Sequence, residues 1–239
     1  MLFKIIGYLL YIILFFKVCN LHEQDAPPET WKSAFFASLP VMHLIFVVMS
    51  TTAKTKGHEI YKRTMIIALL FAMAGDIAMI WPEKNFILGM MFFAGTHLFY
   101  MRSFGFKPRG PPASLVSCFM LGSLAFMYLQ PGIKSMQMQA LILMYQVVLF
   151  GMFWRAWIQM QANPSIGSAC GMIGAIVLVI SDLIVASNRF IGKVDNGPMY
   201  MLSTYYIGQL FITASAAYYR PHPYRATDEK IYSYKERLN

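Results

Sequence analysis

Residues 166–187 read IGSACGMIGAIVLVISDLIVAS, an apolar run that contains a single charged side chain, Asp182. A helix needs about 20 predominantly apolar residues to cross a bilayer, so this run predicts a membrane-spanning helix. Gaps that contain proline or glycine separate it from other apolar runs, as expected where helices end. The sequence predicts an all-α integral membrane protein, a bundle of about eight transmembrane helices at 2–19, 33–52, 64–81, 86–104, 113–129, 138–157, 166–187 and 199–218.

The overall composition supports the same fold class. Hydrophobic residues make up 57% of the chain and charged residues only 13%, with a mean hydropathy of +0.50. Soluble domains average about 45–50% apolar and about 25% charged residues. The net charge of +9 is spread over the gaps between apolar runs, which fits membrane topology and does not indicate a nucleic-acid partner. The three cysteines form neither a disulfide framework nor a zinc motif, so we expect them to pack as small side chains.

The connections are too short to contain a separate soluble domain. We therefore expect residues 1–219 to form one eight-helix transmembrane catalytic domain and residues 220–239 a polar cytosolic tail. Lys4 and Lys17 bracket the first apolar run, as in the core of a signal peptide. No small-x-small cleavage site follows it, so we expect the run to be retained as a helix.

The basic residues predict the orientation in the membrane. If the helices alternate in direction, 14 of the 20 Lys and Arg residues lie on the side of the N-terminus. An excess of basic residues marks the cytosolic face. Both termini are therefore expected in the cytosol.

Two aspartates lie inside predicted spans, Asp76 in the third and Asp182 in the seventh. A charged side chain at the centre of a membrane helix costs about 2.5–3.5 kcal/mol on insertion scales, so such residues usually face the interior and mark a functional site. Both lie about six residues, or roughly 9 Å, inside the non-cytosolic end. Tyr205 of the eighth span reaches the same layer, among Ser203, Thr204, Tyr206 and Gln209.

Several functions fit two buried carboxylates. One acid can stay protonated while the other ionises, which gives an acid–base pair without a metal. The same pair could serve a proton-coupled transporter, a packing role, or a non-enzymatic lipid-binding protein. His97, on the fourth span, could be either a catalyst or a hydrogen bond between helices. Phosphate loops and the G-x-S-x-G and H-E-x-x-H motifs are absent, so neither a cofactor nor a metal is expected.

A wider set of residues resembles a known family. The stretch 74–81 reads AGDIAMIW and leads into Phe86, Gly89, Phe93, His97 and Tyr100. It is followed by Ser181-Asp182-Leu183, by Asn188-Arg189-Phe190, and by Ser203 to Tyr206 with Gln209. This set resembles the YhhN-like lysoplasmalogenase family over most of the chain, from Leu39-Pro40 onward. One departure is Ala37, where the resemblance leads us to expect a lysine.

The resemblance implies an eight-helix enzyme of the endoplasmic reticulum membrane. Its substrates are lysoplasmalogens, whose vinyl-ether bond is hydrolysed by water to a fatty aldehyde and glycerophosphocholine or glycerophosphoethanolamine. Asp76 and Asp182 match the proposed catalytic pair, and which of them is the acid stays open. The candidates for orienting the substrate or water are His97, Tyr205, Gln209, Asn188, Tyr100 and Ser203. The oligomeric state is left open.

Overall fold

The computed structural model describes residues 2–21 and 26–220. This part of the chain forms eight α-helices and one short 3₁₀ helix, with no strand, which confirms the predicted all-α class. The helices are α1 (Leu2–Val18), α2 (Trp31–Met49), α3 (Lys56–Ala78), α4 (Pro82–Phe104), α5 (Pro112–Leu129), η1 (Gln130–Gly132), α6 (Met136–Ala162), α7 (Ile166–Phe190) and α8 (Gly197–Ala217). The predicted tail lies outside the described residues, apart from Arg220.

The residues that begin the helices explain where they start. The side chains of Thr30, Thr55, Ser135 and Ser165 accept hydrogen bonds from backbone N–H groups in the first turns of α2, α3, α6 and α7. Such caps satisfy donors that have no partner within the helix. Proline occupies the first turn of α4, α5 and α8, where its missing N–H is not needed. The Ser, Thr and Pro residues between the apolar runs therefore set where most of the helices begin.

Two helices run past the apolar segments that predicted them. α3 begins at Lys56, well before the predicted residue 64, and α6 continues to Ala162 rather than 157. The added residues 56–63 form about two turns, which are largely polar and include an exposed ion pair between Arg63 and Glu59. Apolar runs mark the part of a helix that suits lipid, whereas the helix itself can continue into the interface.

By length and composition alone, four helices of the described residues are long and apolar enough to cross a membrane: α2, α5 with its 3₁₀ extension, α6 and α7. Large apolar side chains point outward on the bundle, among them Phe46, Met120 and Leu124, each at least 60% exposed. Exposing so much apolar surface to water would be unfavourable, whereas contact with lipid is favourable. The protein is therefore an integral membrane protein, as the sequence predicted.

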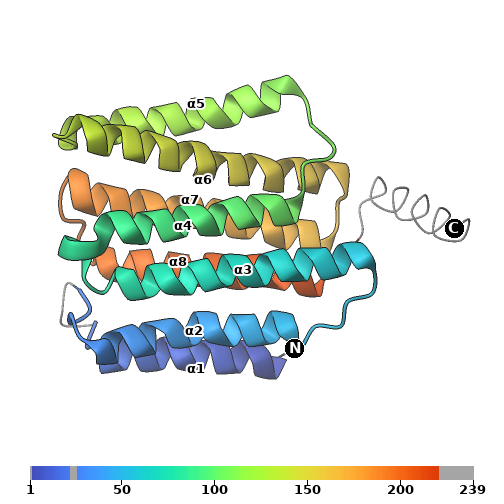
Figure 1. Ribbon diagram of the computed structural model, residues 1–239, viewed down its shortest axis with the longest axis horizontal. Coiled ribbons are helices and arrows are strands. Elements are labelled where there is room, and N and C mark those ends of the chain that lie inside the picture. Colours follow the sequence, from blue (N-terminus) through green and yellow to red (C-terminus); the bar gives the residue numbers. More distant parts are fainter. Residues whose placement is uncertain (1, 22–25, 221–239) are drawn as a thin grey trace, which may run out of the picture.

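The helices lie side by side, and α1 packs onto α2 at one edge (Figure 1). The Tyr8 hydroxyl of α1 donates to the Tyr206 carbonyl of α8 at 2.8 Å, so α1 is part of the bundle. α3 and α4 approach closely at Gly75, Gly89 and Gly95, where an added Cβ atom would lie less than 3.0 Å from Phe93, Met79 and Phe71, respectively. The start of α1 and the end of α8 lie at the same end of the bundle (Figure 1).

Other polar and sulfur-containing side chains agree with the sequence interpretation. His43 Nε2 lies 2.8 Å from the Lys4 carbonyl oxygen, so this half-buried histidine joins α2 to α1. Cys19, Cys118 and Cys170 are all free, and the first two are buried.

Candidate active site

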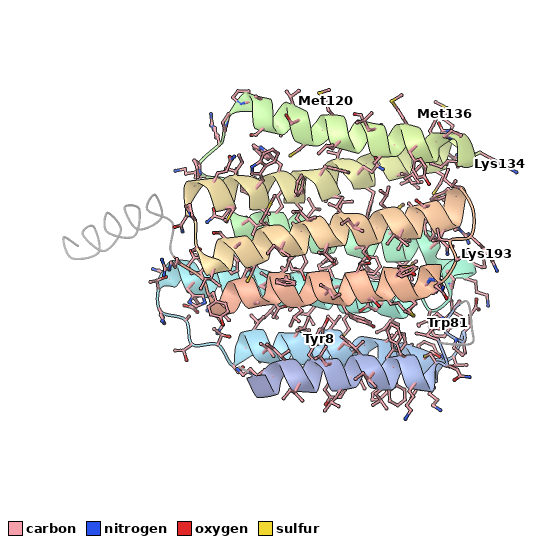
Figure 2. The ribbon with its side chains drawn as sticks, turned by 180° about the vertical axis from the view of Figure 1, so that it is seen from behind. Tyr8, Trp81, Met120, Lys134, Met136 and Lys193 are labelled. Atoms are coloured by element: carbon pink, nitrogen blue, oxygen red, sulfur yellow. The ribbon has the colours of Figure 1, made fainter. Side chains whose placement is uncertain are left out.

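A cavity of about 510 Å³ among the described residues has both predicted aspartates on its wall. It lies toward the end of the bundle that is opposite to the N-terminus. Trp81, the last residue before α4, and Lys193, in the α7–α8 connection, are at that end (Figure 2). The polar and charged residues of the wall are Asp76, Glu83, Tyr145, Gln146, Ser181, Asp182, Asn188, Arg189, Lys193, Tyr205 and Tyr206. Asp76 and Asp182, far apart in the sequence, therefore face one space.

Asp182 is held by two side chains from other helices. The Tyr145 hydroxyl of α6 donates to Asp182 Oδ2 at 2.8 Å, and His97 Nε2 of α4 lies 3.0 Å from the same oxygen. The Tyr145 hydroxyl oxygen and His97 Nε2 are also 3.0 Å apart. The Asp182 side chain keeps 17% exposure, whereas that of His97 has only 3%. The carboxylate thus faces the cavity beside Tyr145, while His97 lies behind the wall.

Asp76 has a different environment. It lies in the last turn of α3, and its Oδ2 atom is buried without a hydrogen-bond partner. The Tyr205 hydroxyl next to it interacts electrostatically with the carboxyl group but makes no hydrogen bond of acceptable geometry. Oδ2 of Asp76 thus has no hydrogen bond, whereas Oδ2 of Asp182 has two polar partners. Burying an unpaired charge is costly, so this setting favours the neutral acid.

The other predicted residues divide into three groups. Tyr205 and Asn188 line the cavity, and the Asn188 Oδ1 atom also accepts the Val194 N–H at 3.0 Å. His97 is not on the wall but contacts Asp182. Tyr100 donates a hydrogen bond to Gln209 Oε1, and neither residue lines the cavity. Ser203 is half-buried and also lies off the wall.

The structure adds residues that the sequence interpretation missed. Tyr145 and Gln146 interrupt the apolar run 138–157 with two adjacent polar groups, a signal that could have marked them. Glu83 and Arg189 form an ion pair on the cavity wall. Ala37, which stands where the resemblance led us to expect a lysine, also lines the cavity.

The rest of the wall is apolar. Its apolar side chains include Met90 and Phe93 of α4, Leu129 of α5, and Leu149 and Phe150 of α6. Such a lining suits a hydrocarbon chain, while two carboxylates with different partners suit proton transfer. Within residues 2–21 and 26–220, no group of three or more His, Cys, Asp or Glu side chains is placed to hold a metal ion.

Comparison with known proteins gives one family and several relatives. The model of the YhhN family matches residues 32–216. Lysoplasmalogenase TMEM86A of Bos taurus is 29% identical over 195 residues, which cover 78% of this chain and 79% of the relative. Lysoplasmalogenase TMEM86B of Homo sapiens is 31% identical over 192 residues, covering 78% and 76%. No solved structure matches the chain significantly.

Proposed function

Because this chain belongs to the YhhN family and resembles proteins named lysoplasmalogenases, we propose that it hydrolyses the vinyl-ether bond of lysoplasmalogens. The products are a fatty aldehyde and glycerophosphocholine or glycerophosphoethanolamine. One observation carries the proposal: two carboxyl groups with unequal hydrogen bonding share the wall of one largely apolar cavity. Residues 1–219 are the proposed catalytic unit.

The chemistry needs an acid and a base. Protonation of the β-carbon of the vinyl ether gives an oxocarbenium ion at the carbon attached to oxygen. Water adds to that carbon and loses a proton to the base, and the resulting hemiacetal breaks down to aldehyde and alcohol. Glycosidases use two carboxyl groups around a similar oxocarbenium-like transition state.

We assign the acid to Asp76 and the base to Asp182. Asp76 Oδ2 is buried without a partner, which favours the protonated form that can give a proton to carbon. Asp182 accepts from Tyr145 and lies within hydrogen-bond distance of His97, an arrangement that stabilises a carboxylate. The ionised group can orient and deprotonate water, and its charge favours the nearby oxocarbenium ion.

The cavity lining suggests how the substrate lies. The single hydrocarbon chain would occupy the part lined by Phe93, Leu149 and Phe150, and the glycerol headgroup would face the opposite, charged part. Tyr205, beside Asp76, is placed to contact the ether oxygen or the water.

We further propose that the protein resides in the endoplasmic reticulum with both termini in the cytosol. The basic residues are concentrated on the side of the N-terminus, and α1 starts at the end of the bundle where α8 finishes. Tags on both ends should be digested by protease added to intact microsomes. Protection of either tag would overturn this orientation.

The test of function is aldehyde release from 1-alkenyl-glycerophosphocholine by purified protein in detergent micelles. Asp76→Asn and Asp182→Asn should each lower kcat by about 10²- to 10⁴-fold while the protein remains folded. Asp195→Asn is the matched control, because Asp195 is exposed in the α7–α8 connection and lies off the cavity wall. A folded wild-type protein that releases no aldehyde in micelles would contradict the proposal. Proton flux in sealed liposomes would then test a transporter.

A further inference from the structure

The charged end of the cavity contains an ion pair that the acid–base chemistry does not use. Glu83 lies in the first turn of α4 and Arg189 in the last turn of α7. Arg189 donates through both terminal nitrogens to the two carboxylate oxygens of Glu83, the second at 3.3 Å. Both residues line the cavity. The pair therefore joins two helices at the wall where a headgroup would lie.

The position of Arg189 along α7 matches the length of the substrate. Arg189 follows Asp182 by seven residues, which is about 10 Å along the helix and nearly the same face. In a glycerol lysophospholipid, a few single bonds of about 1.5 Å each separate the vinyl-ether oxygen from phosphorus, so the two lie roughly 6 Å apart. The guanidinium group could therefore reach the phosphate while the vinyl ether lies beside Asp182.

The charges of the pair complement those of a zwitterionic headgroup. A guanidinium binds phosphate oxygens through two parallel hydrogen bonds. A carboxylate suits the ammonium group that follows the phosphate in choline and ethanolamine headgroups. Arg189 Cζ also lies 5.3 Å from the centre of the Phe86 ring, and Phe86 contacts Phe190 edge to face at 5.8 Å. Both rings line the cavity and could contact a quaternary ammonium.

The ion pair is also easily exchanged for a ligand. The Glu83 and Arg189 side chains are 72% and 35% exposed, and exposed ion pairs contribute little to stability. The Arg189 guanidinium keeps the pKa of Glu83 below its usual value, so Glu83 is ionised at neutral pH. Replacing each partner with a substrate charge therefore costs the fold little.

We propose that Arg189 binds the phosphate and Glu83 the ammonium group of the substrate headgroup, so that the pair positions the vinyl ether between the two aspartates. This inference rests on the proposed function for the identity of the substrate. It adds residues that select the headgroup to residues that carry out the chemistry.

Two assays on the full-length protein in micelles test the inference. The first measures binding of radiolabelled saturated 1-O-alkyl-glycerophosphocholine, which lacks the reactive double bond. The second measures KM and kcat for aldehyde release. Arg189→Gln should raise both Kd and KM by about ten-fold or more, the loss expected for a charge-assisted contact. Glu83→Gln should weaken binding of the phosphocholine analogue by a smaller factor. A second analogue, 1-O-alkyl-glycerol phosphate, ends in phosphate and has no ammonium group, and its binding to Glu83→Gln should be unchanged or stronger.

The controls separate recognition from stability. Glu59 and Arg63 form the matched exposed pair on α3, away from the cavity wall, so Glu59→Gln and Arg63→Gln should leave Kd and KM unchanged. The double variant Glu83→Arg with Arg189→Glu restores an ion pair with reversed polarity. If the pair only joins α4 to α7, this variant should recover wild-type binding, which would overturn the inference. If the pair reads the headgroup, binding should stay weak at an unchanged unfolding temperature.

The outcomes also separate this inference from the proposed function. Wild-type turnover with unchanged Kd and KM in Arg189→Gln would overturn headgroup recognition and leave hydrolysis standing. The wild type could instead bind the analogue but release no aldehyde. If Arg189→Gln then lost that binding, the result would support headgroup recognition without hydrolysis. The compound 1-O-alkyl-glycerol has no phosphate. If Arg189→Gln weakened its binding as much as that of the phosphocholine analogue, the inference would also be overturned.

Discussion

His97 Nε2 lies 3.0 Å from Asp182 Oδ2, so a histidine of α4 contacts a carboxylate of α7 behind the cavity wall. The Tyr145 hydroxyl approaches the same oxygen, at 2.8 Å. Because both contacts involve Oδ2, the Oδ1 atom is left to receive water or substrate. This arrangement orients Asp182 in the way that a third group orients the base in many hydrolases.

The contact predicts that His97 and Tyr145 act by positioning Asp182. Tyr145→Phe and His97→Leu should each lower kcat by about ten-fold or more, with KM changed less than about three-fold, because binding contacts are kept while the base is misplaced. His97→Asn keeps an N–H donor and should recover part of the loss. Single-substrate kinetics of the purified variants provide the measurement.

A double variant sharpens this test. If both residues act through Asp182, the combined loss in kcat should be smaller than the product of the single losses, since both disable one group. Multiplicative losses, or an equal rise in KM, would indicate independent roles and contradict the positioning argument.

The hydrogen bond from Tyr100 to Gln209 predicts a structural role for both residues. Tyr100 is fully buried, and neither residue lines the cavity. Tyr100→Phe would leave the buried Gln209 amide without this donor, which costs about 1–3 kcal/mol. Thermal unfolding in micelles should show a lower midpoint, while kcat/KM of the remaining folded protein changes little.

Tyr128→Phe is the control for that prediction, because Tyr128 is 53% exposed on α5. Its unfolding midpoint should match that of the wild type. A large fall in kcat for Tyr100→Phe at unchanged stability would instead place Tyr100 in the substrate-orienting group that the family resemblance implies.

Spacing along the chain predicted that the two aspartates lie toward the same end of the bundle, but neither their distances from the helix ends nor their neighbours. Asp76 lies two residues before the end of α3, and Asp182 lies eight residues before the end of α7. Asp76 and Asp182 could be placed near one end because each lies a few residues before the end of its predicted span. For His97 the sequence left a catalyst and a hydrogen bond between helices both open, and did not indicate its contact with Asp182. Counting residues gives a height within one helix, whereas a contact also depends on the rotation and relative shift of α4 and α7.

Residue type also limited the sequence interpretation. Tyr145 was counted as part of an apolar run, although its hydroxyl becomes a donor when the ring is buried. The Glu83–Arg189 pair joins residues from opposite halves of the chain. In the sequence, Arg189 contributed to the basic-residue count and to the family resemblance, while nothing singled out Glu83 as its partner. Side-chain pairs between distant helices depend on packing, which composition and spacing do not specify.

The environment of His58 predicts a pH dependence of stability. The Lys54 N–H donates to His58 Nδ1 at 3.3 Å, so Nε2 carries the proton and donates to the Ala216 carbonyl at 2.9 Å. Burial lowers the pKa of His58, and Lys62 and Lys54 lower it further, against the opposing effect of the Ala216 carbonyl. The unfolded chain therefore binds the proton more readily than the folded one.

Stability from this site should be complete above the unfolded pKa of about 6.5 and fall as the pH drops below it. The unfolding midpoint of the wild type should thus decrease from pH 7.5 to pH 5.5. His58→Gln should start lower and show a smaller decrease over that range. An equal decrease in both proteins would mean that other groups cause the pH dependence.

The close packing of α7 on α8 gives the last prediction. A Cβ atom added at Gly174 would lie 2.7 Å from the Ile212 backbone nitrogen and 2.9 Å from the Gly208 carbonyl oxygen. Backbone atoms cannot move aside as flexible side chains do, so Gly174→Ala should force the helices apart and destabilise the protein by about 1–3 kcal/mol. The gain in helix propensity, about 1 kcal/mol, offsets only part of this.

Gly192→Ala is the control, because a Cβ there meets no atom within 4 Å. Since α7 carries Asp182 and Arg189, we expect Gly174→Ala to lower both the unfolding midpoint and kcat. An unchanged midpoint would show that the two helices can separate at little cost.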